Sequence, residues 1–159
     1  MALEGKAQVL ARCALFEDFT PTGLAIFAGI VGERPVPAGA PLFVEGMASD
    51  ALYVVESGEL RVEMRDAQGG QTELGRIGPN ETLGQMALLQ PGGVRLVTAI
   101  AAEPTVVLEL RARDFTRLQA EKPQACVKLM RAIAQQLGRA LGDSRDAIAR
   151  AAQGSAPRG

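Results

Sequence analysis

A glycine-led turn and a later arginine are the residues of this sequence best suited to chemistry. Gly84 opens the segment Gly84–Leu89, directly after a predicted strand and turn. The first N–H groups of a helical turn lack internal acceptors and lie at the positive end of its dipole, so they can hold a phosphate. Arg95 follows Gln85 by ten residues and can pair the same anion through two parallel hydrogen bonds, and Gly92 and Gly93 let the backbone approach closely. These residues predict an anion site, although an isolated arginine also fits a salt-bridged surface position.

The residue inventory excludes several classes of catalyst. Histidine is absent, which removes Ser-His-Asp and Cys-His catalysis and every His-ligated metal site. The glycine-led turn contains no paired carboxylates, and no metal-ligand spacing is evident, so we expect no catalytic residues, no metal and no required cofactor. Cys13 and Cys126 lie far apart and form no CxxC motif, which favours buried, inert thiols and leaves a disulfide open.

Length, charge and apolar content predict one packed domain. The chain has 159 residues, 17 basic and 18 acidic side chains and a formal charge of −1, which argues against nonspecific binding to nucleic acid or an anionic membrane. Hydrophobic residues make up 47%, enough for a core. Neither a signal peptide nor a bilayer-spanning run is evident, so we expect a cytoplasmic protein. The alanine-, glycine- and arginine-rich usage is typical of bacteria with GC-rich genomes.

The elements that must position the site begin with an N-terminal helical segment over residues 1–33. A short helix is predicted at residues 7–16. A second helix is predicted to begin at Pro21, with Thr20 just before it. Its apolar stripe is best explained as core: Leu24, Phe27, Ile30 and Val31.

Residues 34–113 are predicted to form a barrel of short strands. Five strands are expected: Leu52–Val55, Leu60–Arg65, Thr72–Ile77, Val94–Ala101 and Thr105–Arg111. The second of them alternates apolar and charged residues, and Gly69-Gly70 marks a hairpin turn after it. The segment 84–90 has room only for a helical turn. This spacing favours an antiparallel barrel or jelly roll.

Residues 114–152 are predicted to form a short helix and then a long one starting at Pro123, followed by a disordered tail over residues 153–159. The long helix carries apolar residues at alternating spacings of three and four, which is typical of a two-helix interface. The seam comprises Val127, Met130, Ala134, Leu137, Leu141, Ser144 and Ile148. Its first half also fits packing on the barrel, but the rest needs another partner, so we expect a homodimer through this helix.

Three stretches occur in an order and at a spacing that point to one family. They are Gly39–Gly46, Asp50–Val55 with Gly58, and Gly84–Leu89 with Arg95. In these stretches the chain resembles the cyclic nucleotide-binding domains of catabolite activator proteins, kinase regulatory subunits and some channels. The resemblance covers roughly residues 15–145 and implies a mainly β fold. That fold is an antiparallel double-stranded β-helix (jelly roll) with N-terminal helices and a long C-terminal helix.

The resemblance also implies ligand-binding roles for Gly84, Gln85, Met86, Ala87, Arg95 and Leu96. Arg95 and the backbone amides near Met86 and Ala87 would hold the cyclic phosphate of cAMP or cGMP. Gln85 replaces the glutamate that binds the ribose 2′-hydroxyl in the family, and a neutral amide makes a weaker bond than a carboxylate. Leu96 replaces a Ser, Thr or Ala.

The base-reading part of the predicted site is apolar. Leu74, Ala140 and Leu141 are the candidate base-facing residues. In the activator proteins polar groups contact the base at the positions of Ala140 and Leu141. The phosphate half of the family's site is therefore kept, while the ribose half is weakened and the base half offers no hydrogen bond.

Two functions remain open at this point. The first is a non-catalytic cyclic nucleotide sensor that signals through the C-terminal helix to an unknown protein effector. The second is a degenerate form of the fold, acting as a ligand-independent dimerisation or scaffold module. Only about 36 residues follow Pro123, too few for a helix-turn-helix reader, so we expect a stand-alone module that does not bind DNA directly.

Overall fold

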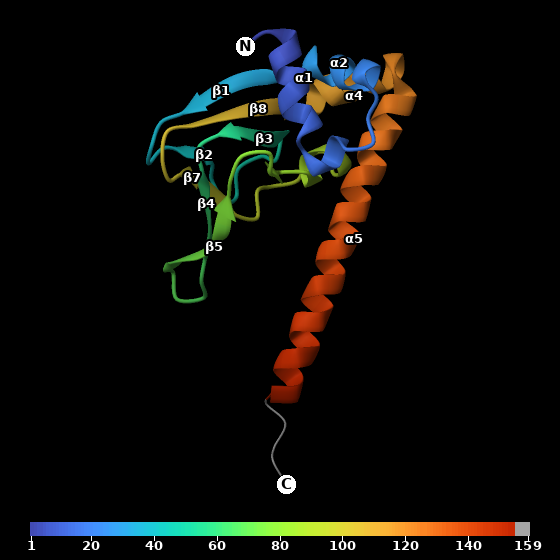
Figure 1. Cartoon of the computed structure of the whole chain (residues 1–159). Helices are drawn as coiled ribbons and strands as arrows, with labels where there is room; N and C mark the ends of the chain where they lie inside the picture. The colour runs from blue at the N-terminus through green and yellow to red at the C-terminus, as the bar shows by residue number, and fades with distance from the viewer. Residues whose placement is uncertain (155–159) are drawn as a thin grey trace.

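A computed structural model describes residues 1–154 and shows two four-stranded antiparallel sheets flanked by helices (Figure 1). The strand order is β1-β8-β3-β6 in one sheet and β2-β7-β4-β5 in the other. The strands are β1 Gly32–Val36, β2 Pro41–Phe43, β3 Ala51–Ser57, β4 Leu60–Arg65, β5 Gln71–Ile77, β6 Thr82–Leu83, β7 Thr98–Ala101 and β8 Thr105–Arg111. The predicted jelly roll with flanking helices is confirmed.

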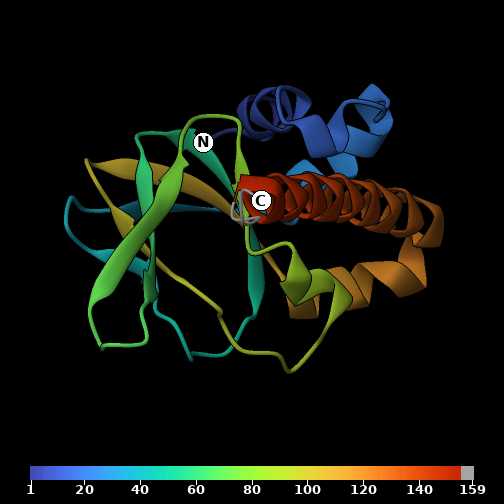
Figure 2. The ribbon, with the colours of Figure 1, turned by 90° about the horizontal axis from the view of Figure 1, so that it is seen from below.

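The helices gather beside the strands, and the last one runs away from them (Figures 1 and 2). They are α1 Leu3–Ala11, the 3₁₀ turn η1 Ala14–Phe16, α2 Pro21–Ala28, α3 Met86–Leu89, α4 Ala112–Glu121 and α5 Pro123–Gly154. Helix α2 starts as predicted, with Pro21 at its first position and the Thr20 hydroxyl accepting from the Gly23 N–H at 3.1 Å. The helix start at Pro123 is also confirmed.

Three predicted boundaries differ from the structure. The helix expected over residues 7–16 begins earlier and ends at Ala11, because the chain turns at Cys13 to bury Leu15 and Phe16. The barrel strands span residues 32–111 rather than 34–113. At the end of the chain, residues 153–154 continue α5, and the remainder of the predicted disordered tail lies outside the described residues.

The strand expected over residues 94–101 is shorter than predicted, with only Thr98–Ala101 in the sheet. The backbone of Arg95 instead pairs with the loop after β2. Its N–H donates to the Met47 carbonyl at 2.7 Å, and its carbonyl accepts from the Gly46 N–H at 2.8 Å. This pairing fixes the backbone of residues 94–97 at the edge of the barrel, beside the loop that follows β2.

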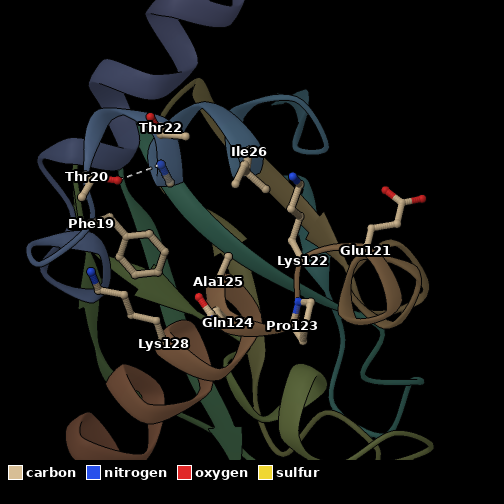
Figure 3. Close-up of a pocket in the computed structure, with 11 residues that line it drawn as sticks. Phe19, Thr20, Thr22, Ile26, Glu121, Lys122, Pro123, Gln124, Ala125 and Lys128 are labelled. Atoms are coloured by element: carbon tan, nitrogen blue, oxygen red, sulfur yellow. Dashed lines mark hydrogen bonds between the residues drawn. The ribbon is translucent and has the colours of Figure 1, made fainter.

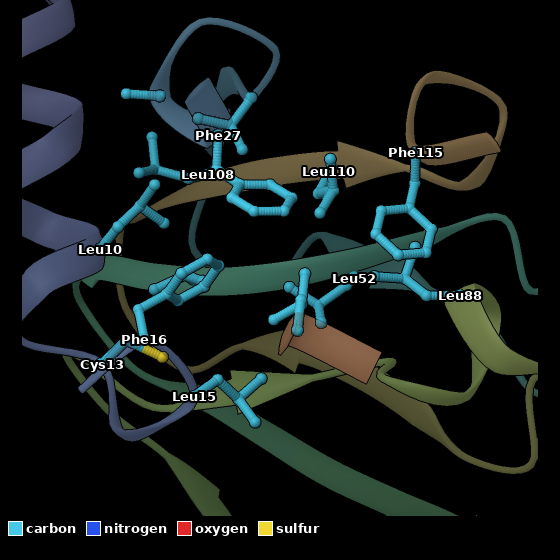
Figure 4. Packing of buried hydrophobic residues seen from close by; sticks show 14 of the residues in the cluster. Leu10, Cys13, Leu15, Phe16, Phe27, Leu52, Leu88, Leu108, Leu110 and Phe115 are labelled. Atoms are coloured by element: carbon cyan, nitrogen blue, oxygen red, sulfur yellow. The ribbon is translucent and has the colours of Figure 1, made fainter. Parts of the chain in front are cut away.

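Strand β3 divides the core in two. Leu52 and Val54 pack under the helices, while Ala51, Tyr53 and Val55 face the barrel interior. This explains why the strand has a continuous apolar run and not an alternating one, since both of its faces are covered. Figure 4 shows the helix-side cluster, in which Phe16 and Phe27 meet edge to face with 5.5 Å between ring centroids.

Helix α5 packs on the core of the described chain through its first part. Cys126, Leu129 and Ile133 are buried against the core, and every residue from 138 to 154 is exposed. The predicted seam lies mostly on the adjacent, open face of the helix. Val127, Leu141 and Ile148 are 49%, 72% and 70% exposed, whereas Met130 and Leu137 pack partly against the core.

Both cysteines are buried and free, so the chain has no disulfide between them. Burial raises the pKa of the Cys13 and Cys126 thiols. Among residues 1–154 there is no cluster of three or more potential metal ligands. No described helix combines the length and the hydropathy that a membrane span requires.

Candidate functional site

The cassette turn, residues 84–89, and Arg95 meet at one cavity of about 620 Å³. The cavity lies between the barrel strands, this turn and α5, and its size falls in the range of small-molecule sites. Most of its lining side chains are apolar, among them Phe43, Val62, Ile77, Leu83, Val97 and Leu137. The polar side chains that line it are Ser49, Thr82, Gln85, Gln90 and Arg95.

The Arg95 guanidinium is the buried charge of this site. The residue is 4% exposed, and its Cζ lies 4.2 Å from the ring centroid of Phe43 and 5.4 Å from that of Tyr53. The two rings are stacked on each other, one from each sheet, so they present π faces to the cation inside the barrel. Burial, and secondarily the charge of Glu109, raise the pKa of Tyr53, so its phenol stays neutral beside the arginine.

Within residues 1–154, one of the three guanidinium nitrogens has a hydrogen-bond partner. Nη2 donates to the Ala51 carbonyl at 3.0 Å and to the Asp50 carboxylate at 3.4 Å. Nε and Nη1 are buried without any partner among the described residues. A buried donor left unpaired costs about 1–3 kcal/mol, so both of these N–H groups are suited to donate to an anionic oxygen.

The glycine at position 84 makes room for this arrangement. Its φ is +79°, and a Cβ there would come within 2.6 Å of Arg95 Nη1 and 2.7 Å of the Ala51 carbonyl oxygen. A side chain is therefore opposed twice, once by the backbone conformation and once by the guanidinium. The glycine predicted from the sequence lies directly against the arginine predicted with it.

The cassette turn offers backbone donors beside the same cavity. The N–H groups of Gln85 and Met86 make no hydrogen bond within the described chain. Ala87, which was expected to supply an amide to the phosphate, instead donates to the Gly84 carbonyl at 3.1 Å and is fully buried. The free donors in the described chain are therefore those of Gln85 and Met86, both among the residues that the sequence analysis expected to bind the ligand, whereas the Ala87 amide is engaged.

The side chain of Gln85 is engaged by the long helix. Its Nε2 donates to Oε1 of Gln136 on α5 at 2.9 Å. The sequence analysis expected this side chain to face a ribose hydroxyl. Its partner lies 51 residues further along the chain and carries no local signal of the contact.

The remaining predicted residues are placed unevenly around the cavity. Leu96 lines it and is 75% exposed, so it stands at the mouth. Leu74 is exposed on β5 and does not line the cavity. Ala140 and Leu141 lie on the exposed part of α5, beyond Leu137, which is the residue of that helix that lines the cavity.

Three residues that contact Arg95 were missed by the sequence analysis. Phe43, Tyr53 and Asp50 all lie in the stretches quoted for the family resemblance, yet none was assigned to the site. Phe43 and Tyr53 are two of only six aromatic residues in the chain. Because an aromatic ring can stack on a guanidinium, the occurrence of two of these few rings in the stretches quoted with Arg95 was the available signal. Asp50 is 76% exposed at its side chain, so it neutralises Arg95 only partly.

A second cavity, of about 520 Å³, lies between α2 and the α4–α5 junction (Figure 3). Its lysines are already engaged or open to solvent. Lys128 donates to the Asp18 carbonyl and lies 5.1 Å from the centroid of the Phe19 ring, and Lys122 is exposed. None of the predicted site residues lines this cavity.

Arg95 and the glycine-led turn thus meet at one cavity of a jelly-roll domain. Residues 33–122 match the family model described as the cyclic nucleotide-binding domain. The chain belongs to this family. It is therefore a domain of the kind that regulatory proteins use to sense cyclic nucleotides.

The relatives of the chain include a transcriptional regulator and a receptor protein. It is 27% identical over 146 residues to a CRP-like cAMP-activated global transcriptional regulator of Mycobacterium tuberculosis, covering 89% of this chain and 62% of that protein. It is 32% identical over 123 residues to a cyclic AMP receptor protein of Thermus thermophilus, covering 77% of this chain and 56% of that protein. The chain thus spans about three fifths of the length of these relatives.

A solved structure shows the same fold over nearly its whole length. It is the N-terminal domain of a transcriptional regulator from Streptomyces coelicolor A3(2), 29% identical, with a TM-score of 0.75. The match covers 83% of this chain and 94% of that domain.

Proposed function

We propose that this chain is a non-catalytic regulatory module of the cytoplasm that binds a cyclic nucleotide, cAMP or cGMP, through Arg95. The observation that carries the proposal is the buried guanidinium with two unpaired nitrogens, Nε and Nη1, beside the cavity. A cyclic phosphate is a monoanion with two exocyclic oxygens, which can accept hydrogen bonds from these unpaired donors. The free N–H groups of Gln85 and Met86 supply further donors.

The rest of the ligand would fill the apolar part of the cavity. Its volume of about 620 Å³ accommodates a nucleotide, and Phe43, Val62 and Leu137 offer apolar contact to a purine. Arg95 is the charged residue among those that line the cavity. Affinity would therefore come from the phosphate and from ring burial, and discrimination between the two bases would be small.

Signalling would run from the cassette turn to α5. Leu137 lines the cavity and Gln136 bonds Gln85, so a ligand in the cavity touches the helix in two ways. The distal half of α5 is exposed and carries Leu141 and Ile148 on one stripe. We propose that this stripe forms a homodimer interface, and that a ligand changes the orientation of α5 and so the surface that an effector protein reads.

Isothermal titration with cAMP and then cGMP tests this function. We expect saturable binding at micromolar concentration, with one site per chain. Arg95→Ala should abolish it, because the variant removes the anion receptor, whereas Arg117→Ala on the exposed side of α4 should bind as the wild type does. Equal binding by Arg95→Ala and the wild type would contradict the proposal.

The second candidate, a ligand-independent dimerisation module, is favoured by two observations. The Asp50 carboxylate oxygen already lies 3.4 Å from Arg95 Nη2, and the Gln85 amide nitrogen already donates to the Gln136 side-chain oxygen. Under this alternative, millimolar cAMP or cGMP produces no heat and no shift in melting temperature, while the chain still dimerises.

A further inference from the structure

A cavity of about 740 Å³ adjoins the cavity of Arg95, but Arg95 itself does not line it. The two cavities share Phe43, Ser49 and residues 92–94, and the volume falls in the range of small-molecule sites. None of the residues that the sequence analysis assigned to ligand binding lines this second space. We call it the Glu109 cavity. The charged residues that line it are Arg34, Asp50, Glu109, Arg111 and Arg113.

The Glu109 carboxylate holds two guanidinium groups at this cavity. Its Oε1 accepts from Arg111 Nε at 2.7 Å, and its Oε2 accepts from Arg34 Nη1 at 3.2 Å. Each arginine uses one of its three nitrogens in this contact, and the other two make no hydrogen bond within residues 1–154. The Glu109 side chain is 12% exposed, whereas those of Arg34 and Arg111 are 45% and 52% exposed. The carboxylate therefore fixes both cations while their remaining donors stay open to a ligand.

Two more groups of the lining have no partner in the part of the chain that the structure describes. Arg113 is exposed and makes no ion pair or hydrogen bond there. The Tyr53 hydroxyl makes no hydrogen bond there either, and burial raises the pKa of this phenol, so it stays protonated and can donate. Three arginines thus face two carboxylates, Glu109 and Asp50, and Asp50 also contacts Arg95 from outside this lining. The cavity has an excess of positive charge.

We propose that the Glu109 cavity binds a small molecule that carries a phosphate dianion, such as a phosphate monoester. The open nitrogens of Arg34, Arg111 and Arg113 donate to the phosphate oxygens, since the guanidinium fork matches phosphate geometry. A carboxylate offers one charge and two oxygens to the same donors and therefore binds more weakly. Leu42, Met47 and Val94 also line the cavity and contact the apolar part of the ligand.

Titration calorimetry with phenyl phosphate at about pH 8, where a phosphate monoester is a dianion, tests this site. The titration is made on Arg95→Ala, so that binding in the cavity of Arg95 is not mistaken for it. We expect saturable binding at one site per chain. Adding Arg113→Ala should weaken it by about tenfold or more, because a charge-assisted contact is lost. Adding Arg117→Ala, four residues further along α4 and outside the lining, should leave the affinity unchanged.

The comparison probe is benzoate, a carboxylate on the same ring, which should bind at least about tenfold more weakly than phenyl phosphate. Equal affinity of the Arg113→Ala and Arg117→Ala variants overturns the inference, as does equal binding of the two probes or no heat at millimolar phenyl phosphate. If Arg95→Ala does not fold, the same two variants are compared in the wild-type background, where only Arg113 lines the Glu109 cavity. The site does not depend on Arg95, so a failure of cAMP and cGMP to bind the wild type contradicts the proposed function alone.

Discussion

Gly84 and Arg95 lie so close that a single carbon on residue 84 would come within 2.6 Å of the arginine's Nη1. The Ala51 carbonyl oxygen, which accepts from Nη2 of the same guanidinium, would be 2.7 Å from that carbon. The glycine is therefore part of the arginine's binding pocket. Its positive φ and its missing side chain serve the same arrangement.

Gly84→Ala is expected to destabilise the chain by about 2 kcal/mol or more and to weaken cAMP binding. The left-handed backbone costs about 1–3 kcal/mol for a residue with a side chain, and the new methyl displaces the guanidinium. Urea unfolding gives the free energy, and titration gives the affinity. Gly75→Ala is the control, because a Cβ at that strand position meets nothing within 4 Å. Equal stability of the two variants would show that the close approach is absent.

Stability is expected to fall in acid through Glu109. Burial acts to raise the pKa of this carboxyl, but hydrogen bonds from Arg111 at 2.7 Å and Arg34 at 3.2 Å outweigh burial, so the folded-state pKa lies below the ordinary value of 4.5. The unfolded state then binds more protons, so the stabilisation is present above pH 4.5 and is lost as the pH falls through the folded-state pKa. Glu109→Gln should remove this part of the pH dependence of unfolding free energy. An unchanged pH profile in the variant would contradict the assignment.

The two thiols are expected to be inert in the folded chain. Cys13 is 2% and Cys126 0% exposed, and burial raises the pKa of both thiols, so little thiolate is present or accessible. A thiol-reactive disulfide reagent should titrate no thiol in the native protein and two in denaturant. Cys13→Ser should leave one. Rapid modification of the native protein would be the contrary result.

The exposed stripe of α5 is expected to dimerise the chain. Leu141 and Ile148 lie seven residues apart on one face of the helix, each about 70% exposed. The double variant Leu141→Glu/Ile148→Glu should shift the chain to monomer in sedimentation equilibrium without lowering its melting temperature by more than a few degrees. Arg139→Glu/Gln153→Glu, on the opposite face, should remain dimeric. Identical behaviour of both pairs would rule out this interface.

Much of the fold could be predicted because local patterns and tertiary demands agree. The run in β3 is apolar throughout because both faces of that strand are covered. Pro123 begins a helix because its missing N–H and fixed φ suit a first position. Residues 94–97 behaved differently, since their strand propensity was overridden by pairing with Gly46 and Met47.

The site was only half predictable, since its contacts span long stretches of chain. Arg95 and Gly84 were recognised because their types and spacing carry the chemistry. Phe43 and Tyr53 are 52 and 42 residues away from Arg95 in sequence, and only folding shows that they stack with it. On α5 two neighbouring stripes are apolar, so spacing alone could not tell which one faces the barrel. The structure places Cys126, Leu129 and Ile133 there.

The side-chain ¹H–¹⁵N signal of Arg95 Nε gives the most direct test of the account. The signal is identified by its absence in Arg95→Lys. Because Nε is buried and unpaired in the unliganded chain, saturating cAMP should move it downfield and slow its exchange with water, as a phosphate oxygen accepts its proton. A signal that stays unchanged at millimolar cAMP would contradict the claim that this guanidinium is the receptor for the cyclic phosphate.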